Sequence, residues 1–172
     1  NRGFMDRLIN ISLGITMQLR EIDKVLYRKR MNIILASTVI ILLATSLTVS
    51  NILIAAFGSE VDGDNFWWNV IGVIAGLSVV GIAYKIFGKS SLMDEVNYVR
   101  NLKAEMNRIY RSSKKINAAL EEDDKTAMII SYFNLQASKQ VYQLDNNTLT
   151  MDELNEKIRV LDAQIESLGF EI

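Results

Sequence analysis

The feature that most constrains this chain is a stretch from Met31 to Ser59 that contains no charged residue. A helix needs roughly 20 apolar residues to cross the hydrocarbon core of a bilayer, so this run is long enough to span with tilt. A second uncharged run extends from Asn65 to Tyr84. The alternative is a pair of apolar core helices in a soluble protein, but such helices tend to be shorter and to keep a charged face. The pattern therefore favours two membrane spans.

The connection between the two runs predicts a short return of the chain. Residues 58–65 read Gly-Ser-Glu-Val-Asp-Gly-Asp-Asn, and this mixture of glycine and acidic residues is typical of a turn. We therefore expect a transmembrane helical hairpin over residues 31–87. Its spans would cover about 31–57 and 66–87, joined by the acidic loop.

Charge predicts how such a hairpin is oriented. Basic residues flank the spans on the side away from the loop, and they are Arg28, Lys29, Arg30, Lys85 and Lys89. The charged residues of the loop are all acidic. The positive-inside rule then places both termini in the cytoplasm and the loop on the opposite side. Trp67 and Trp68 open the second span, and their rings suit the headgroup level on the loop side.

Both runs carry small or polar residues at helical spacing on one face. In the second run they include Gly72 and Gly76, a GxxxG pair, and in the first run they are Ser37, Ala44, Thr48 and Asn51. In lipid, small residues let helix backbones approach closely, and hydroxyl or amide groups add interhelical hydrogen bonds. We expect these faces to meet each other, a neighbouring copy, or both. Asn51 has a second interpretation, because near the far interface it would simply be hydrated.

The flanking regions predict further helices and an all-α fold. Residues 1–30 predict an amphipathic helix that either lies in the interfacial plane or packs on other helices below the membrane. Residues 88–172 predict soluble cytoplasmic helices at about 92–120, 125–143 and 151–168. Residues 150–153 read as a capping box for the last helix. That helix has a coiled-coil-like seam that needs a facing helix, formed by Leu154, Ile158, Leu161, Ile165 and Leu168.

The composition argues against several classes of function. Cysteine and histidine are absent, so thiolate or imidazole metal ligands and conventional catalytic triads cannot form. No phosphate-binding loop or dinucleotide fingerprint is present. The net charge of −1 gives no electrostatic footprint for nucleic acid. We therefore predict a non-enzymatic protein without metal, cofactor or nucleic-acid partner.

The layout resembles a known group of membrane proteins. An amphipathic lead helix, Arg28-Lys29-Arg30, two close spans and a helix containing Asn107-Arg108-Ile109-Tyr110 occur in this order. Over residues 20–120 this arrangement resembles the SLATT group of two-span proteins, which implies a pore-forming effector coupled to nucleotide-sensing immunity. The resemblance fixes no catalytic or binding residue.

Two functions therefore stay open, with the lipid bilayer as a partner in both. The first is a self-associating, pore-type homo-oligomer. The second is a structural membrane protein, such as a virion component, that anchors a helical scaffold or shell to a bilayer.

Overall fold

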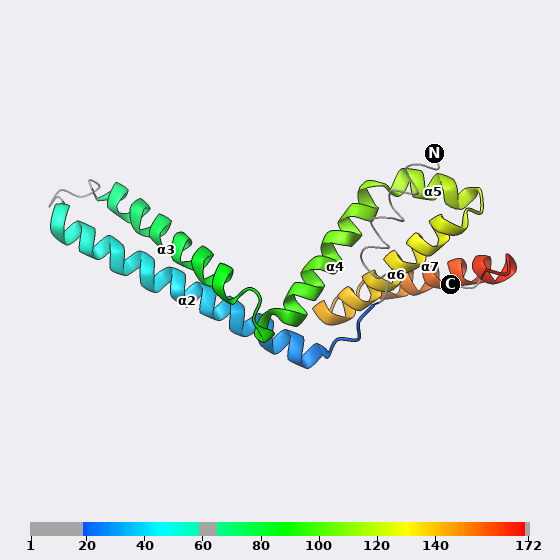
Figure 1. Ribbon diagram of the computed structural model, residues 1–172, viewed down its shortest axis with the longest axis horizontal. Coiled ribbons are helices and arrows are strands. Elements are labelled where there is room, and N and C mark those ends of the chain that lie inside the picture. Colours follow the sequence, from blue (N-terminus) through cyan, green and yellow to red (C-terminus); the bar gives the residue numbers. More distant parts are fainter. Residues whose placement is uncertain (1–18, 59–64, 171–172) are drawn as a thin grey trace. The chain divides into compact units, whose positions relative to one another are not determined.

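The structure is a computed structural model that describes residues 19–58 and 65–170. All regular structure in these stretches is helical, and they contain no strand (Figure 1). The expectation of an all-α fold is thus confirmed for this part of the chain. The chain divides into two compact units, one formed by Val25–Asn97 and the other by Asn1–Lys24 together with Tyr98–Ile172. We describe each unit by itself.

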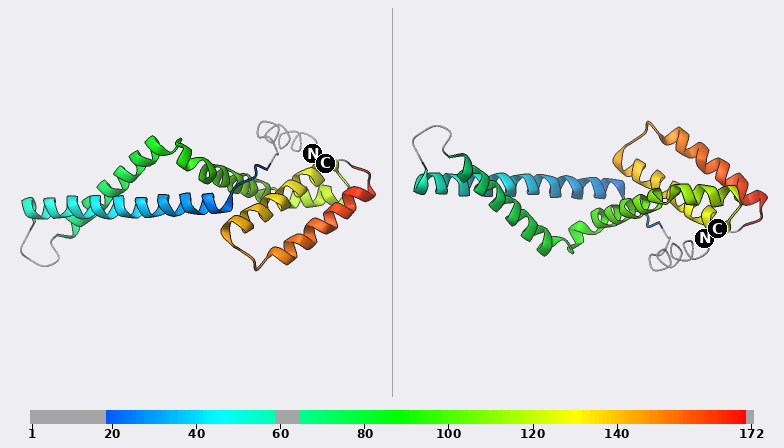
Figure 2. Two further views of the ribbon diagram at one scale, coloured as in Figure 1. Left: turned by 90° about the horizontal axis from the view of Figure 1, so that it is seen from below. Right: turned by 90° about the horizontal axis from the view of Figure 1, so that it is seen from above.

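The first unit is dominated by two long apolar helices, α2 (Lys24–Phe57) and α3 (Phe66–Phe87). Both are long and apolar enough to cross a membrane. At 1.5 Å per residue, the 22 residues of α3 extend over about 33 Å, close to the thickness of a hydrocarbon core. Figure 2 shows that α3 crosses α2 near the loop end and diverges from it towards the end of α3. The short 3-10 helix η1 (Ser91–Met93) follows and leads into α4 (Asp94–Arg111).

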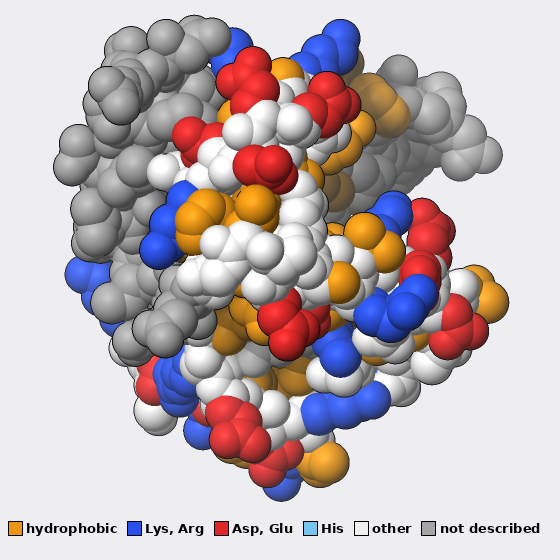
Figure 3. All heavy atoms as spheres, turned by 90° about the vertical axis from the view of Figure 1, so that its right-hand side faces the viewer, with side chains coloured by type: hydrophobic (Ala, Val, Ile, Leu, Met, Phe, Trp, Pro, Cys, Tyr) orange, Lys and Arg blue, Asp and Glu red, His pale blue; other side chains and the backbone are white. Residues whose placement is uncertain are grey.

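The second unit contains the rest of α4 and three further helices, α5 (Ser113–Glu121), α6 (Lys125–Asp145) and α7 (Met151–Ser167). α6 is the central helix, since it packs against both α5 and α7. Its buried side chains face two ways. One set joins Leu102, Ile109 and Ile116 in a core with α4 and α5, and Met128 joins Leu161 and Ile165 of α7. Figure 3 shows acidic and basic side chains interspersed with hydrophobic ones on the face that carries α5 and α7.

The predicted N-terminal helix differs from what the structure shows. Its residues 1–18 lie outside the described residues. Residues 19–23 are not helical. The backbone of Arg20 is instead held by a ring of three hydrogen bonds. The Arg20 backbone N–H donates to the Tyr98 hydroxyl (2.9 Å), and this hydroxyl donates to Gln140 Oε1 (3.1 Å). The Gln140 side-chain amide then donates to the Arg20 carbonyl oxygen (2.5 Å). Residues 24–30 form the first turns of α2, so one continuous helix crosses the expected boundary between residues 30 and 31.

The single helix expected over residues 92–120 is two helices, and this expectation was also wrong. Ser112 separates α4 from α5 with φ −103° and ψ 4°. The N–H groups of Lys115 and Ile116 both bond to the Ser112 carbonyl, which starts a new helix there. The break lets Ile116 join the core formed with α6, because α5 takes its own path along that helix.

Two expectations for the last helix need similar correction. Thr150 is the N-cap residue of α7, but its side chain makes no capping hydrogen bond, so the capping box is not formed. Leu154, Ile158, Leu161 and Ile165 are buried, whereas Leu168 is the C-cap residue and is 37 % exposed. The chain leaves the helix at this point, and it is Phe170 that packs against Leu161 and Ile165.

Candidate functional site

The contact between α2 and α3 is made by small residues. Gly72 lies against Ser50 and the carbonyl oxygen of Ser46, and Gly76 lies against Ser46 and Leu42. The contacting residue of α2 moves back from Ser50 to Ser46 as the residue of α3 advances from Gly72 to Gly76, so the two helices run antiparallel. Gly72, Gly76, Ser46 and Ser50 are all buried. The structure therefore pairs the GxxxG residues of α3 with a Ser-xxx-Ser pair of α2 at the same spacing, which allows close backbone approach.

The outer surface of both helices is apolar. Large side chains along their length are exposed, among them Leu35, Ile40, Leu43, Ile52, Ile74 and Leu77. In each helix only 11 % of the most apolar stretch is buried. A core helix of a soluble protein has the reverse arrangement, with large apolar residues inside and polar ones outside. Exposed apolar patches of this extent mark a surface that meets lipid or protein.

The predicted packing face of α2 does not meet α3. Ser37, Ala44, Thr48 and Asn51 are all exposed. At 3.6 residues per turn, Ser37 lies about 180° and Thr48 about 200° around the helix from Ser46. Ala44, Thr48 and Asn51 thus form a second line of small and polar side chains, away from the contact with α3. Ser37 continues this line to the basic end of the helices, where it lines a cavity together with residues of α3.

Aromatic residues gather at the loop end of the two helices. The rings of Phe57 and Trp68 are 5.6 Å apart, which joins the end of α2 to the start of α3. Trp67 is 69 % exposed and contacts Phe66 edge-on, with ring centroids 5.4 Å apart. Trp68 therefore acts in packing, and Trp67 presents its ring outward as an interfacial anchor would.

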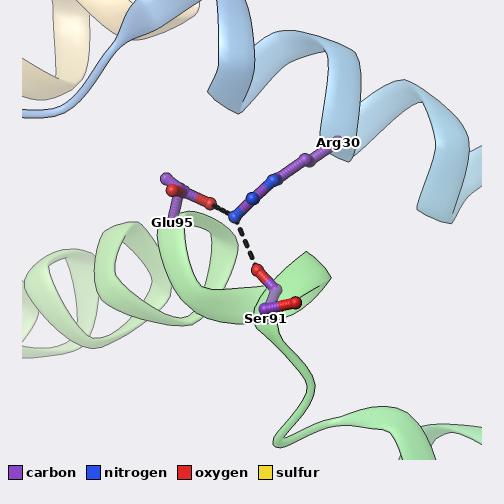
Figure 4. A network of polar contacts seen from close by, with 3 residues as sticks. All are labelled: Arg30, Ser91 and Glu95. Atoms are coloured by element: carbon purple, nitrogen blue, oxygen red, sulfur yellow. Dashed lines mark hydrogen bonds and ion pairs between the residues drawn. The ribbon is translucent and has the colours of Figure 1, made fainter.

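At the opposite end, the basic residues do not behave alike. Arg28, Lys29, Lys85 and Lys89 are exposed. Arg30 instead forms an ion pair with Glu95 in the first turn of α4 and donates to the carbonyl oxygen of Ser91 at 2.5 Å (Figure 4).

The Arg30 network explains why a carboxylate is tolerated in this part of the fold. Glu95 is only 7 % exposed, and a buried carboxylate requires a charged or hydrogen-bonding partner. Its place in the first turn of a helix adds a favourable dipole. Nearby, the Asn97 amide donates to the carbonyl oxygen of Gly88 at 2.6 Å. These contacts tie the first residues of α4 to α2 and to the end of α3.

The seam of α7 is fastened to α6 at its far end. Gly169 has φ +67°, a conformation that favours glycine, and the Phe170 N–H bonds back to the Ile165 carbonyl at 3.2 Å. The Lys125 ammonium lies 5.3 Å from the centre of the Phe170 ring. On the outer face of α7, a hydrogen bond from Lys157 lowers the pKa of the Glu153 carboxyl. This surface is solvated, so the helix is held by its apolar side.

The described residues contain no group of three or more acidic side chains placed to hold a metal ion. The structure thus offers helix-packing surfaces and cavities as its candidate sites.

Comparison with known proteins identifies a family. The family described as "Protein of unknown function (DUF3087)" matches residues 17–172. The chain belongs to the DUF3087 family. No curated protein and no solved structure matches it. The family description assigns no activity, so the function of this DUF3087 chain has to be argued from its residues.

Sequence reasoning missed three features of this DUF3087 chain. Ser46 and Ser50 were overlooked because the line of small residues on the other side of α2 is longer, although their four-residue spacing matches that of Gly72 and Gly76. The burial of Glu95 had no sequence signal, since an acidic residue near a helix start is ordinarily exposed. The cavity described below depends on how α2 and α3 diverge, which residue patterns do not encode.

Proposed function

We propose that this chain is a two-pass integral membrane protein in which α2 and α3 form a transmembrane hairpin that anchors a helical unit. One observation carries the proposal: small and polar residues line the contact between the two helices, and large apolar residues face outward. In water this arrangement would expose the apolar surface, whereas in lipid it is the expected one. The exposed bases at one end of the helices and the acidic loop at the other favour cytoplasmic termini.

We further propose that the protein self-associates and has no enzymatic activity. The exposed line of Ser37, Ala44, Thr48 and Asn51 supports the self-association, because polar groups that face hydrocarbon are costly unless they meet a partner. Symmetric contact with the same line on further copies is the commonest kind of solution. In such an assembly these residues pack near a shared axis, and the resemblance to SLATT proteins favours a pore-type effector.

Self-association and ion flux test this proposal together. Wild-type protein in lipid nanodiscs should form oligomers by mass photometry, and in liposomes it should release a trapped ion. Replacing Thr48 by Ile and Asn51 by Leu removes the polar groups of the line while keeping apolar bulk. This double variant should shift to smaller species and lose flux. Ser78→Val is the control, because Ser78 is exposed on α3 and its hydroxyl bonds only within its own helix, to the Ile74 carbonyl.

A monomeric wild-type protein in nanodiscs would contradict both the oligomer and the pore. Oligomers without flux would favour the second candidate, a structural membrane protein that joins a bilayer to a scaffold or shell. One observation supports this alternative. The second unit carries a cavity of about 400 Å³ between α5, α6 and α7, lined by Ile116, Leu135 and Val160 among others, where a partner segment could bind.

A further inference from the structure

A cavity of about 340 Å³ lies where α2 and α3 diverge at their basic end. Its walls are mostly apolar: Ile34 and Ile41 come from α2, Val80, Ala83 and Phe87 from α3, and Met93 is the last residue of η1. Figure 2 shows that the helix axes of α2 and α3 diverge at this end. The cavity belongs entirely to the first unit, and it is distinct from the glycine–serine contact further along the helices.

It is unfavourable for this cavity to stay empty or to fill with water. Close-packed interiors contain few empty spaces larger than a water molecule, and the atoms lining a void lose their dispersion contacts. Water needs two to four polar partners, and apolar cavities stay dry. The polar side chains of the lining belong to Ser37, Thr38, Tyr84 and Ser90, and the Thr38 hydroxyl already donates to the Ile34 carbonyl at 2.8 Å. The other lining residues are apolar apart from Gly88. The lining therefore suits a hydrocarbon chain.

Two lysines are next to lining residues of this cavity in the sequence. Gly88 and Ser90 line it, and Lys89 lies between them in the sequence, while Lys85 follows the lining residue Tyr84. Neither lysine has an ion-pair partner among residues 19–58 and 65–170.

Arg28 and Lys29 lie at the same end, because α2 and α3 run antiparallel. Among the described residues of the first unit, the acidic ones at this end are Asp94, which is exposed, and Glu95, which is paired with Arg30. The two lysines are thus left to attract an anion.

We propose that this cavity binds one anionic phospholipid. An acyl chain enters between α2 and α3, and the phosphodiester headgroup lies against Lys85 and Lys89. Basic pockets between membrane helices on the cytoplasmic side are suited to anionic headgroups. This inference rests on the proposed membrane insertion of the two helices. It assigns the base of the proposed hairpin a lipid ligand that stabilises the diverged ends of α2 and α3.

Native mass spectrometry of the full-length protein tests the inference. Protein in detergent is mixed with equal amounts of phosphatidylglycerol and phosphatidylcholine that carry the same acyl chains. Wild-type protein should retain one phosphatidylglycerol in preference to phosphatidylcholine. Ala83→Phe fills the cavity and should abolish retention of both lipids. K85Q/K89Q leaves the apolar walls intact and should lower the preference for the anionic lipid about 25-fold, or about five-fold for each base near the headgroup.

Two control variants test whether a large side chain elsewhere on α3, or the loss of bases elsewhere in the chain, has the same effects. Gly81→Phe adds the same ring to α3 where no atom lies within 4 Å of the new Cβ, so it should retain lipid as wild type does. K114Q/K139Q removes two bases from the second unit and should keep the lipid preference. Inorganic phosphate at millimolar concentration should not displace the lipid, since the acyl chain contributes most of the contact.

Equal retention of both lipids by wild-type protein would overturn the inference, and so would retention by Ala83→Phe that matches wild type. If Ala83→Phe does not fold, the lysine variant decides. Carbonate extraction of membranes that contain the protein separates this inference from the proposed function. A chain that resists extraction but retains no lipid refutes the lipid site alone, and a chain that is extracted refutes both.

Discussion

At the scale of single residues, the two glycines of α3 differ in what a side chain would meet. A methyl group on Gly72 would meet the Ser50 hydroxyl and would lie 2.6 Å from the backbone oxygen of Ser46. On Gly76 the nearest group would be the Ser46 hydroxyl, and the Leu42 carbonyl oxygen would be 3.0 Å away. The Ser46 hydroxyl is buried without a hydrogen-bond partner in the described part of the chain. A flexible or unpaired group can be removed by mutation, but a backbone carbonyl cannot.

This difference predicts an asymmetric rescue. Gly72→Ala and Gly76→Ala should each destabilise the contact between α2 and α3 by about 1–3 kcal/mol through overpacking. Adding Ser46→Ala should recover most of the loss at position 76. Adding Ser50→Ala should not recover the loss at position 72, because the Ser46 carbonyl still clashes. Thermal unfolding of the full chain in detergent, followed by tryptophan fluorescence, measures each pair.

Gly81→Ala is the control for helix propensity. No atom lies within 4 Å of a Cβ at that position, so the change should be neutral or stabilising by roughly 0.5–1 kcal/mol. If Gly72→Ala behaves like Gly81→Ala, the contact between α2 and α3 is not as described.

At the scale of elements, the helical spacing of apolar residues predicted correctly which segments are helices. It predicted the ends of these helices less well. The glycine that stops α7 was readable, because Gly169 is followed by an apolar Phe170. The break at Ser112 was not, since Ile109 and Ile116 keep a seven-residue spacing across it. That break is decided by packing of α5 on α6, which is tertiary information. Helix capping was also not fully readable from the sequence. Thr150 fits the capping pattern, but its side chain makes no capping hydrogen bond, whereas the side chain of Asp124 does.

These two N-caps give a matched pair of substitutions. The Asp124 carboxylate accepts a hydrogen bond from the Ala127 N–H at 2.9 Å at the start of α6. Asp124→Ala should therefore lower the free energy of unfolding of the second unit by about 1 kcal/mol. Thr150→Ala removes no capping bond and should have a much smaller effect. Circular-dichroism melts of the full chain report both, and equal losses would show that the Asp124 cap contributes nothing specific.

At the scale of the whole molecule, the sequence already indicated one strongly apolar region and one amphipathic region, because charge is excluded from one and periodic in the other. The partner of each face was not readable. Ser37, Ala44, Thr48 and Asn51 form the longer line of small residues on α2, yet Ser46 and Ser50 meet α3. A helix with two such lines leaves open which one serves the hairpin and which serves another copy.

The proposed topology gives the last prediction. With two spans, the segments before α2 and after α3 lie on the same side, and the positive-inside rule makes that side cytoplasmic. The chain has no cysteine, so single cysteines can be introduced without background labelling. Glu21→Cys and Leu149→Cys use exposed positions on the two flanks, and Ser59→Cys reports on the loop. In sealed, right-side-out vesicles an impermeant maleimide should label only the loop variant, and detergent should make all three react. Labelling of one flank but not the other in intact vesicles would leave a single span. Labelling of both flanks with the loop protected would invert the proposed orientation while keeping two spans.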